Sequence, residues 1–310
     1  SWFKGMNSSV YITRMVVEPF VRLHTLGISY LDGNRYDKIM SRALGFLDAQ
    51  AIASYNRMKK WEKENKEKAY LGENELHYLY LNTPLPHALS KDGKDAVDFF
   101  MEHLEQQASR MTMYDKALAC IILIKHGKKS EAKKHLQSLL EYTVYSDELG
   151  RYYDTNRAMY SWRNYRIPVQ TLLMEVLYAM QKEELTVDPE KPAMATDQIR
   201  RQLCQWLLNQ RRTQLWSNSS TIMDALYALL MAPKSELQVT VADKLYTKSE
   251  VTAKLSPKMP NEWVVNRDES SDSPMSWVSV SMKTFMPMSE VRQDTAHTGL
   301  KISREYYIES

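Results

Sequence analysis

Two kinds of helical segment alternate along the first three quarters of this sequence, and this alternation restricts the fold more than any other feature. Segments of the first kind are almost wholly apolar, as expected of helices that are buried on all sides: residues 114–126, 167–183 and 221–231. Segments of the second kind have one apolar and one charged face: residues 94–110, 130–144 and 197–210. Each pair takes about 40 to 50 residues. The pattern predicts a mainly α fold, an α/α toroid with an inner and an outer ring of helices.

A polar elbow between residues 210 and 221 indicates how such helices are joined. Residues 219–221 are expected to cap the second helix, because serine and threonine oxygens accept from free backbone N–H groups. Apolar residues at helical spacing predict the packing face on each side of the elbow: Ile199, Leu203, Trp206 and Leu207 before it, and Ile222, Ala225, Leu226 and Leu229 after it.

The N-terminal region predicts two helices. An apolar stripe marks the first, over residues 11–26: Tyr11, Ile12, Met15, Val16, Phe20, Leu23 and Leu26. Pro19 should kink this helix, because proline removes a backbone hydrogen bond. A second helix should follow Gly33 and end in the mixed-charge run 59–68, which is typical of a solvated helix end.

The character of the sequence changes at Ala232 and Pro233. Alternating apolar and polar residues predict short strands at residues 237–241, 277–282 and 300–303. We therefore expect two domains: a toroid over residues 1–233, and a smaller β-sandwich-like module over residues 234–310 whose remaining strands would come from a longer parent chain.

Bulk composition excludes few classes of protein. The formal net charge of +3 gives no reason to expect a nucleic-acid or membrane partner. The sequence contains no run of about 18 apolar residues, so it predicts no membrane span. The sequence opens with neither an initiator methionine nor a signal peptide, and we interpret it as a piece of a longer protein.

Cysteine and histidine spacing predicts neither a nucleophile nor a metal site. Cys120 and Cys204 lie among apolar residues on expected helices, so we expect buried free thiols. The histidines considered as ligands are scattered, without a pair four residues apart: His77, His87, His103, His126 and His135. No cofactor is predicted.

Short motifs occur in a fixed order along the chain, at residues 2–5, 11–13, 114–119, 168–180, 216–229, 237–241 and 299–307. They begin with Trp2-Phe3-Lys4-Gly5 and include Trp216-Ser-Asn-Ser-Ser-Thr221 before an Ala-Leu pattern. In order and spacing they resemble the α2-macroglobulin family, specifically its large Bacteroides-type bacterial members, over essentially the whole chain. The resemblance implies most of a thioester-type α/α-toroid domain and part of the β domain that follows it.

The family traps proteases: a bait segment is cut, the molecule collapses around the protease, and in many members a Cys–Gln thioester acylates the target. Neither Cys120 nor Cys204 matches the thioester motif Cys-x-Glu-Gln, so the motif would lie upstream or be absent from the parent. The resemblance therefore implies a non-catalytic scaffold of a broad-spectrum endopeptidase inhibitor, not an enzyme, in the periplasm or at the cell surface. Its partners would be proteases, through the full-length parent, and other domains of the same chain.

Two other classes of function stay open at this point. α/α toroids also host carbohydrate-active enzymes such as lyases and glycosidases, in which paired acids act at the inner rim. The candidate acids for such a site are Glu75, Asp115, Asp154 and Asp224. A purely structural protein-docking module is the other alternative.

An aromatic stretch predicted to be a loop, residues 150–165, carries the candidate contact residues Tyr152, Tyr153, Tyr160 and Trp162. Aromatic rings stack on sugars and anchor protein interfaces, so these residues could form a contact surface. The alternative is an apolar lid over one rim of the toroid.

Overall fold

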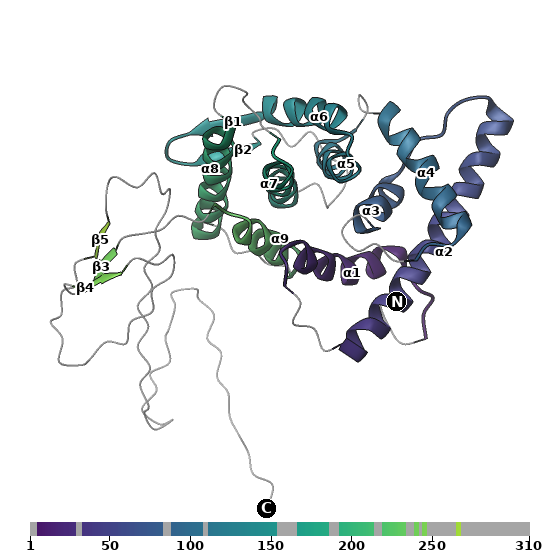
Figure 1. Cartoon of the computed structure of the whole chain (residues 1–310), viewed down its shortest axis with the longest axis horizontal. Helices are drawn as coiled ribbons and strands as arrows, with labels where there is room; N and C mark the ends of the chain where they lie inside the picture. The colour runs from purple at the N-terminus through teal and green to yellow at the C-terminus, as the bar shows by residue number, and fades with distance from the viewer. Residues whose placement is uncertain are drawn as a thin grey trace, which may run out of the picture. The chain divides into compact units, whose positions relative to one another are not determined.

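The computed structural model describes residues 5–28, 33–82, 88–107, 111–153, 166–185, 192–213 and 219–233, and three short strands within residues 239–267 (Figure 1). The chain divides into two units, Ser1–Pro274 and Met275–Ser310, and all described residues belong to the first. Within them the chain forms nine helices and five short strands, which confirms the prediction of a mainly α fold.

The helices follow one another with short connections. They are α1 (Val10–Thr25), α2 (Gly33–Asn65), α3 (Glu73–Asn82), α4 (Lys91–Gln106), α5 (Met113–Lys125), α6 (Lys129–Glu141), α7 (Arg166–Lys182), α8 (Pro192–Thr213) and α9 (Ser219–Leu230). Between α6 and α7, β1 (Thr143–Ser146) and β2 (Gly150–Tyr153) form an antiparallel hairpin. After α9, β3 (Val239–Val241) pairs antiparallel with both β4 (Lys244–Tyr246) and β5 (Val265–Arg267).

Local sequence sets several helix ends. The hydroxyl oxygens of Ser9, Ser90 and Thr112 accept hydrogen bonds from backbone N–H groups in the first turns of α1, α4 and α5. Gly127 follows α5 with a φ of 74°, a conformation that glycine adopts without strain, so α5 ends where the sequence predicts.

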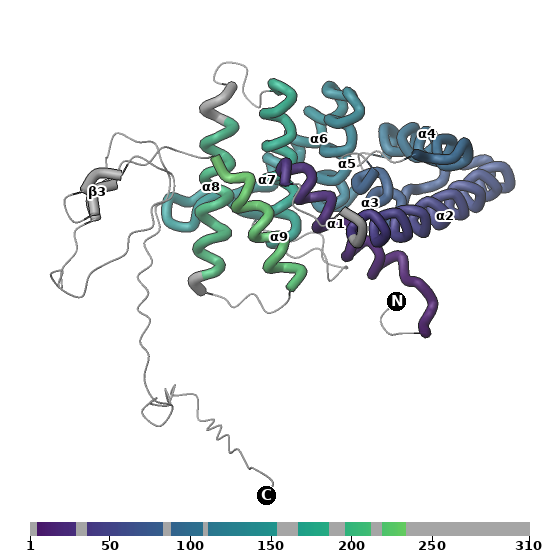
Figure 2. Tube along the Cα trace, turned by 60° about the horizontal axis from the view of Figure 1, so that its bottom comes forward, coloured from purple at the N-terminus to yellow at the C-terminus, as the bar shows by residue number. Residues whose placement is uncertain are grey.

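The odd-numbered helices contact one another in sequence order, α1 with α3, α3 with α5, α5 with α7 and α7 with α9, and α9 also contacts α1. We call these five the inner helices. Figure 1 shows α4, α6 and α8 outside α3, α5 and α7, and Figure 2 shows α1 beside α9. This order agrees with the predicted alternation of inner and outer helices, while the closed toroid as a whole stays a prediction.

Helices α5 and α7 form the centre of the core. Residues 117–124 of α5 are at most 2% exposed, and Leu172, Leu173, Val176 and Leu177 of α7 are fully buried. The outer helices are buried on one side only, through Phe100 and Leu104 in α4 and through Leu203 and Leu207 in α8. The two predicted kinds of helix are therefore confirmed for these elements.

Helix α9 departs from the prediction of a helix buried on all sides. Four of its apolar side chains are 38% to 56% exposed: Ile222, Met223, Leu226 and Leu230. We call these four residues the α9 face. The prediction that Ile222 and Leu226 pack inward is wrong, because Asp224, Ala225, Tyr227 and Ala228 occupy the buried side instead. Asp224 binds Arg22 of α1, and this ion pair turns the opposite side of α9 outward.

Helix α1 departs from prediction in the same way. Its buried residues are Arg14, Val17, Glu18, Val21 and Arg22, and Val16 of the predicted apolar stripe is 44% exposed. The remaining members of that stripe are partly buried. Pro19 lies inside the helix as predicted.

Three boundary predictions also change. The helix predicted over residues 130–144 ends at Glu141, because Thr143 and Val144 begin β1. Residues 150–153, predicted as a loop, form β2. Residues 219–221 lie inside the first turn of α9 instead of capping it, since α9 begins at Ser219.

Part of the predicted β module can be compared with the structure. Val239–Val241 is a strand, which agrees with the strand predicted over residues 237–241. The strands predicted at residues 277–282 and 300–303 lie outside the described residues. The domain boundary at residue 233 stays a prediction.

Candidate functional site

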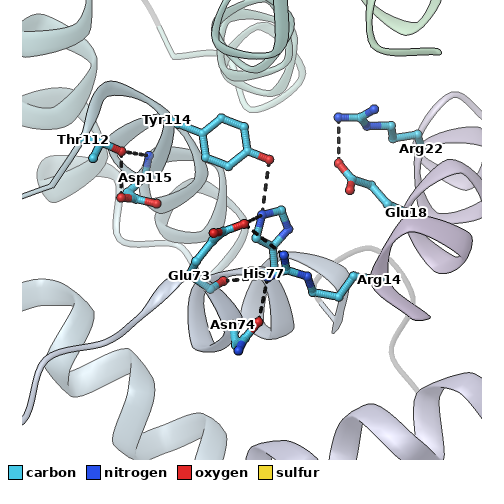
Figure 3. A network of polar contacts seen from close by, with 9 residues as sticks. All are labelled: Arg14, Glu18, Arg22, Glu73, Asn74, His77, Thr112, Tyr114 and Asp115. Atoms are coloured by element: carbon cyan, nitrogen blue, oxygen red, sulfur yellow. Dashed lines mark hydrogen bonds and ion pairs between the residues drawn. The ribbon is translucent and has the colours of Figure 1, made fainter. Parts of the chain in front are cut away.

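A network of polar contacts joins α1 to the first turn of α3 (Figure 3). Arg14 is 3% exposed, and its Nη1 donates to the Glu73 backbone oxygen at 3.2 Å and to Asn74 Oδ1 at 3.0 Å. Its Nη2 donates to Glu73 Oε1 at 2.9 Å. The guanidinium fork of one buried arginine thus holds the N-terminal end of α3.

The same network continues to α5 through a buried histidine. His77 Nε2 lies 3.7 Å from Glu73 Oε1 and 3.2 Å from the Tyr114 hydroxyl (Figure 3). His77 is fully buried, whereas the Glu73 side chain is 41% exposed. The imidazole thus links α3 to α5, and Glu73 also binds Arg14 of α1, so the network joins three inner helices.

A second buried arginine joins α1 to α9. Arg22 Nη2 lies 2.8 Å from Glu18 Oε1, and its Nη1 donates to Asp224 Oδ1 at 2.5 Å. The guanidinium also lies 4.9 Å from the centroid of the Tyr227 ring. Burial alone would lower the pKa of Arg22, but the carboxylates of Glu18 and Asp224 raise it well above its ordinary value.

A third set of buried polar groups lies on α3, α5 and α7. Glu175 is 1% exposed and accepts a hydrogen bond from the Tyr80 hydroxyl at 2.8 Å. Burial raises the pKa of Glu175, and the nearby charges of Lys125 and Arg22 only partly offset this. Burial also lowers the pKa of Lys125. Each inner helix therefore contributes a charged or phenolic side chain to the interior.

The acids considered for glycoside or lyase chemistry have separate structural partners. Glu75 accepts from the Ser54 hydroxyl at 2.6 Å and from the Gly72 backbone N–H at 2.9 Å. Asp115 accepts from the Thr112 hydroxyl at 2.7 Å, and burial raises its pKa.

The two remaining candidate acids differ in what can be said of them. Asp224 forms the ion pair with Arg22 described above. Asp154 lies outside the described residues. The three described candidates thus serve different structural contacts: Glu75 joins α3 to α2, Asp224 joins α9 to α1, and Asp115 bonds the N-cap residue of its own helix, α5.

The two aromatic candidates that the structure describes, Tyr152 and Tyr153, do not form an exposed surface. Tyr153 is 3% exposed and belongs to the core, because β2 packs against α7 and α8. Tyr152 is partly buried and stacks on Trp206, with ring centroids 6.0 Å apart. Tyr160 and Trp162 lie outside the described residues. The described pair therefore fixes the hairpin on α8.

Both cysteines are buried free thiols, as predicted. Cys120 Sγ donates to the Ala132 backbone oxygen at 3.2 Å, and burial raises the pKa of Cys204 to about 12. Reactive cysteines have lowered pKa values and partial exposure, so neither thiol has the environment of a nucleophile.

Within the described ranges, no group of three or more His, Cys, Asp or Glu side chains could hold a metal ion. Of the histidines named above, His87 falls outside those ranges. None of the described helices combines the length and the apolar character needed to cross a membrane.

An open cleft of about 480 Å³ lies at the C-terminal ends of α1, α7 and α9, next to the start of α8. Its lining includes Leu26, Tyr178, Arg200 and Leu230. Arg200 is 3% exposed, donates to Gln181 Oε1 and to the Met231 backbone oxygen, and lies over the Tyr178 ring. The arginine therefore holds the wall of the cleft. Leu230 belongs to both the cleft and the α9 face, so the two are continuous.

The α9 face is the functional candidate that sequence reasoning missed. Periodicity placed Ile222 and Leu226 on the buried side, and Asp224, the one charged residue of α9, was considered only as a candidate acid of a carbohydrate-active site. The signal that could have revealed the inversion is the spacing of Arg14, Glu18 and Arg22, which puts three charges on one side of an otherwise apolar helix. Such a stripe needs buried counter-charges, and Asp224 supplies one of them.

A search with family models found no match for this chain, and a search of curated proteins found none either.

Proposed function

We propose that this chain is a non-catalytic scaffold of an α2-macroglobulin-like protein, a broad-spectrum endopeptidase inhibitor that traps proteases in the periplasm or at the cell surface. Two observations support the proposal. The first is the order of the sequence motifs. The second is that the helical region buries charged side chains between α1 and α9, while the α9 face exposes apolar side chains. In this view the chain acts by contact and rearrangement, without covalent chemistry of its own.

The observation that carries the proposal is the α9 face. Exposed apolar residues that gather on one helix favour an interaction surface, whereas single exposed apolar residues need no explanation. Ile222 and Leu226 lie one helical turn apart, and Leu230 lies one turn further on. A scaffold that packs against other domains or partners needs such a surface.

The carbohydrate-active alternative receives less support. A glycosidase needs two carboxyl groups on opposite sides of one sugar-binding space. The described candidates Glu75, Asp115 and Asp224 are instead engaged with Ser54, Thr112 and Arg22 respectively.

The first test uses the full-length parent protein and a panel of endoproteases, assayed on protein substrates and on small peptides, with and without methylamine. Trapping predicts that cleavage of large substrates is lost while small peptides are still cleaved. Sensitivity to methylamine would add a thioester in the parent. Proteases that stay fully active on large substrates would overturn the inhibitor proposal.

A second test asks whether the α9 face takes part. Leu226→Glu in the full-length parent should leave the folded chain intact, because Leu226 is 51% exposed, and should weaken inhibition of large-substrate cleavage. The matched control is Ile39→Glu on α2, where the isoleucine is 40% exposed. Equal inhibition by the two variants and the wild-type protein would show that the α9 face is not the contact.

A further inference from the structure

The inner face of α1 is charged, unlike that of α5 or α7. Arg14, Glu18 and Arg22 follow one another at four-residue spacing and are all less than 9% exposed. Val17 and Val21 are the fully buried apolar residues beside them. By contrast, the buried residues of α5 are almost all apolar, from Met113 to Ile124.

Arginine contacts hold α1 to its inner neighbours on both sides. Arg14 binds Glu73 and Asn74 at the start of α3 (Figure 3). Arg22 binds Asp224 of α9. Arginine and carboxylate groups are well hydrated when exposed, so water can replace these contacts when the helix moves away. Buried apolar side chains have no such substitute.

Part of the apolar packing of α1 is with α2, whereas its arginine contacts are with α3 and α9. The rings of Phe20 and Tyr36 meet edge to face with centroids 5.3 Å apart. The ends of α1 are also locally determined, since Ser9 caps its first turn and Gly27 follows its last turn with a φ of 76°. These features allow α1 to stay helical and remain on α2 when its polar contacts open.

We propose that α1 is a detachable element that undocks from α3 and α9 as a unit, with the contacts of Arg14 and Arg22 as its latch, while α5 and α7 stay packed. Undocking uncovers Asp224 and the inner side of α9. It is a conformational device of the helical region and does not depend on the proposed inhibitor function.

Amide hydrogen exchange followed by mass spectrometry, in sub-denaturing guanidinium chloride, tests this on the unmodified chain. Residues 10–25 should exchange together, at lower denaturant than residues 113–125 and 166–182, because local opening needs less free energy than global unfolding. Exchange of α1 at the same denaturant concentration as α5 and α7 would overturn the proposal.

Variants separate the latch from the ordinary fraying of a terminal helix. Asp224→Asn removes the charge that faces Arg22, and we expect α1 to exchange at least about tenfold faster, with little change in α5. Asn74→Ala removes one acceptor of Arg14 and should act in the same direction.

The matched control is Tyr78→Phe, which removes a 2.8 Å hydrogen bond from α3 to Asp48 of α2 and leaves the partners of Arg14 and Arg22 in place. It should leave the exchange of α1 relative to α5 unchanged. If Asp224→Asn instead accelerates all helices equally, or none, the latch is excluded. Should that variant not fold, the same comparison is made with Asn74→Ala, which weakens the Arg14 contact instead.

Discussion

Among the buried acids of the described residues, Glu175 has the surroundings that least favour a charged carboxylate. It is 1% exposed, and its Oε2 accepts from Tyr80 while its Oε1 has no hydrogen-bond partner among the described groups. Lys125, whose charge favours the ionised carboxylate, is itself partly buried on α5. Burial therefore dominates, and the folded chain binds a proton at Glu175 more readily than the unfolded chain does.

Glu175→Gln should make the chain more stable than the wild-type protein at high pH and should leave it little changed at low pH. The folded pKa of Glu175 lies above its ordinary value of 4.5, so the stabilisation by the protonated form is present below that value and is lost as pH rises through the folded pKa. The difference should approach about 1.4 kcal/mol for each unit by which the pKa is raised.

Urea unfolding of the wild-type protein and the glutamine variant, from pH values below 4.5 to values above the folded pKa, measures this difference in the free energy of unfolding. A glutamine variant that loses stability relative to wild type as pH rises would mean that the Glu175 carboxylate is charged and well paired in the folded chain.

At the scale of elements, the β1–β2 hairpin shows how closely a loop can pack on a helix. Gly150 begins β2 with a φ of 85°, and a Cβ atom there would collide with backbone atoms of Gln202 and Trp206 in α8. The Arg151 side chain adds a 2.9 Å hydrogen bond to Gln202 Oε1. Glycine thus lets the hairpin backbone approach α8.

Gly150→Ala should destabilise the chain by well over the about 1 kcal/mol expected from an unfavourable φ alone, because either the hairpin or α8 must also move. Gly127→Ala is the control, since Gly127 has a similar φ of 74° and nothing within 4 Å of the added atom. Comparing the free energies of unfolding of the two variants checks this. Equal losses would mean that the close approach costs nothing.

At the scale of the whole molecule, the described helices form a self-supporting set of contacts. The core runs through α5 and α7, and the nine helices found among the described residues lie between Val10 and Leu230. We therefore expect a chain of residues 1–233 to fold cooperatively, with the helical circular-dichroism signal and the midpoint of thermal unfolding of the helical region unchanged. A lower midpoint, or a loss of cooperativity, would show that later residues complete the helical core.

The sequence allowed the type and position of most helices to be predicted. Residues 114–126 and 167–183 are almost wholly apolar, which favours burial on all sides, and the structure confirmed these two helices. Short segments around residues 143–153 were harder, because a β-hairpin beside a helix has no strong periodicity.

The orientation of α1 and α9 could not be predicted from local sequence. Periodicity assumes that charged residues face water, and Arg22 instead faces an acid 202 residues away, Asp224. Only the folded arrangement brings the two together. The same long-range pairing explains why periodicity did not predict the α9 face: because Asp224 lies on the buried side, Leu226 is exposed.

The distance along the chain between Arg22 and Asp224 also determines how long after Arg22 its partner acid is synthesised. Chains grow at about 5 to 20 residues per second, so Arg22 would emerge about 10 to 40 s before its partner acid is made. Glu18, whose Oε1 lies 2.8 Å from Arg22 in the folded chain, is on the same helix and is already made. We therefore expect the polar contacts of α1 to be completed only after α9, the last of the described inner helices, has been synthesised.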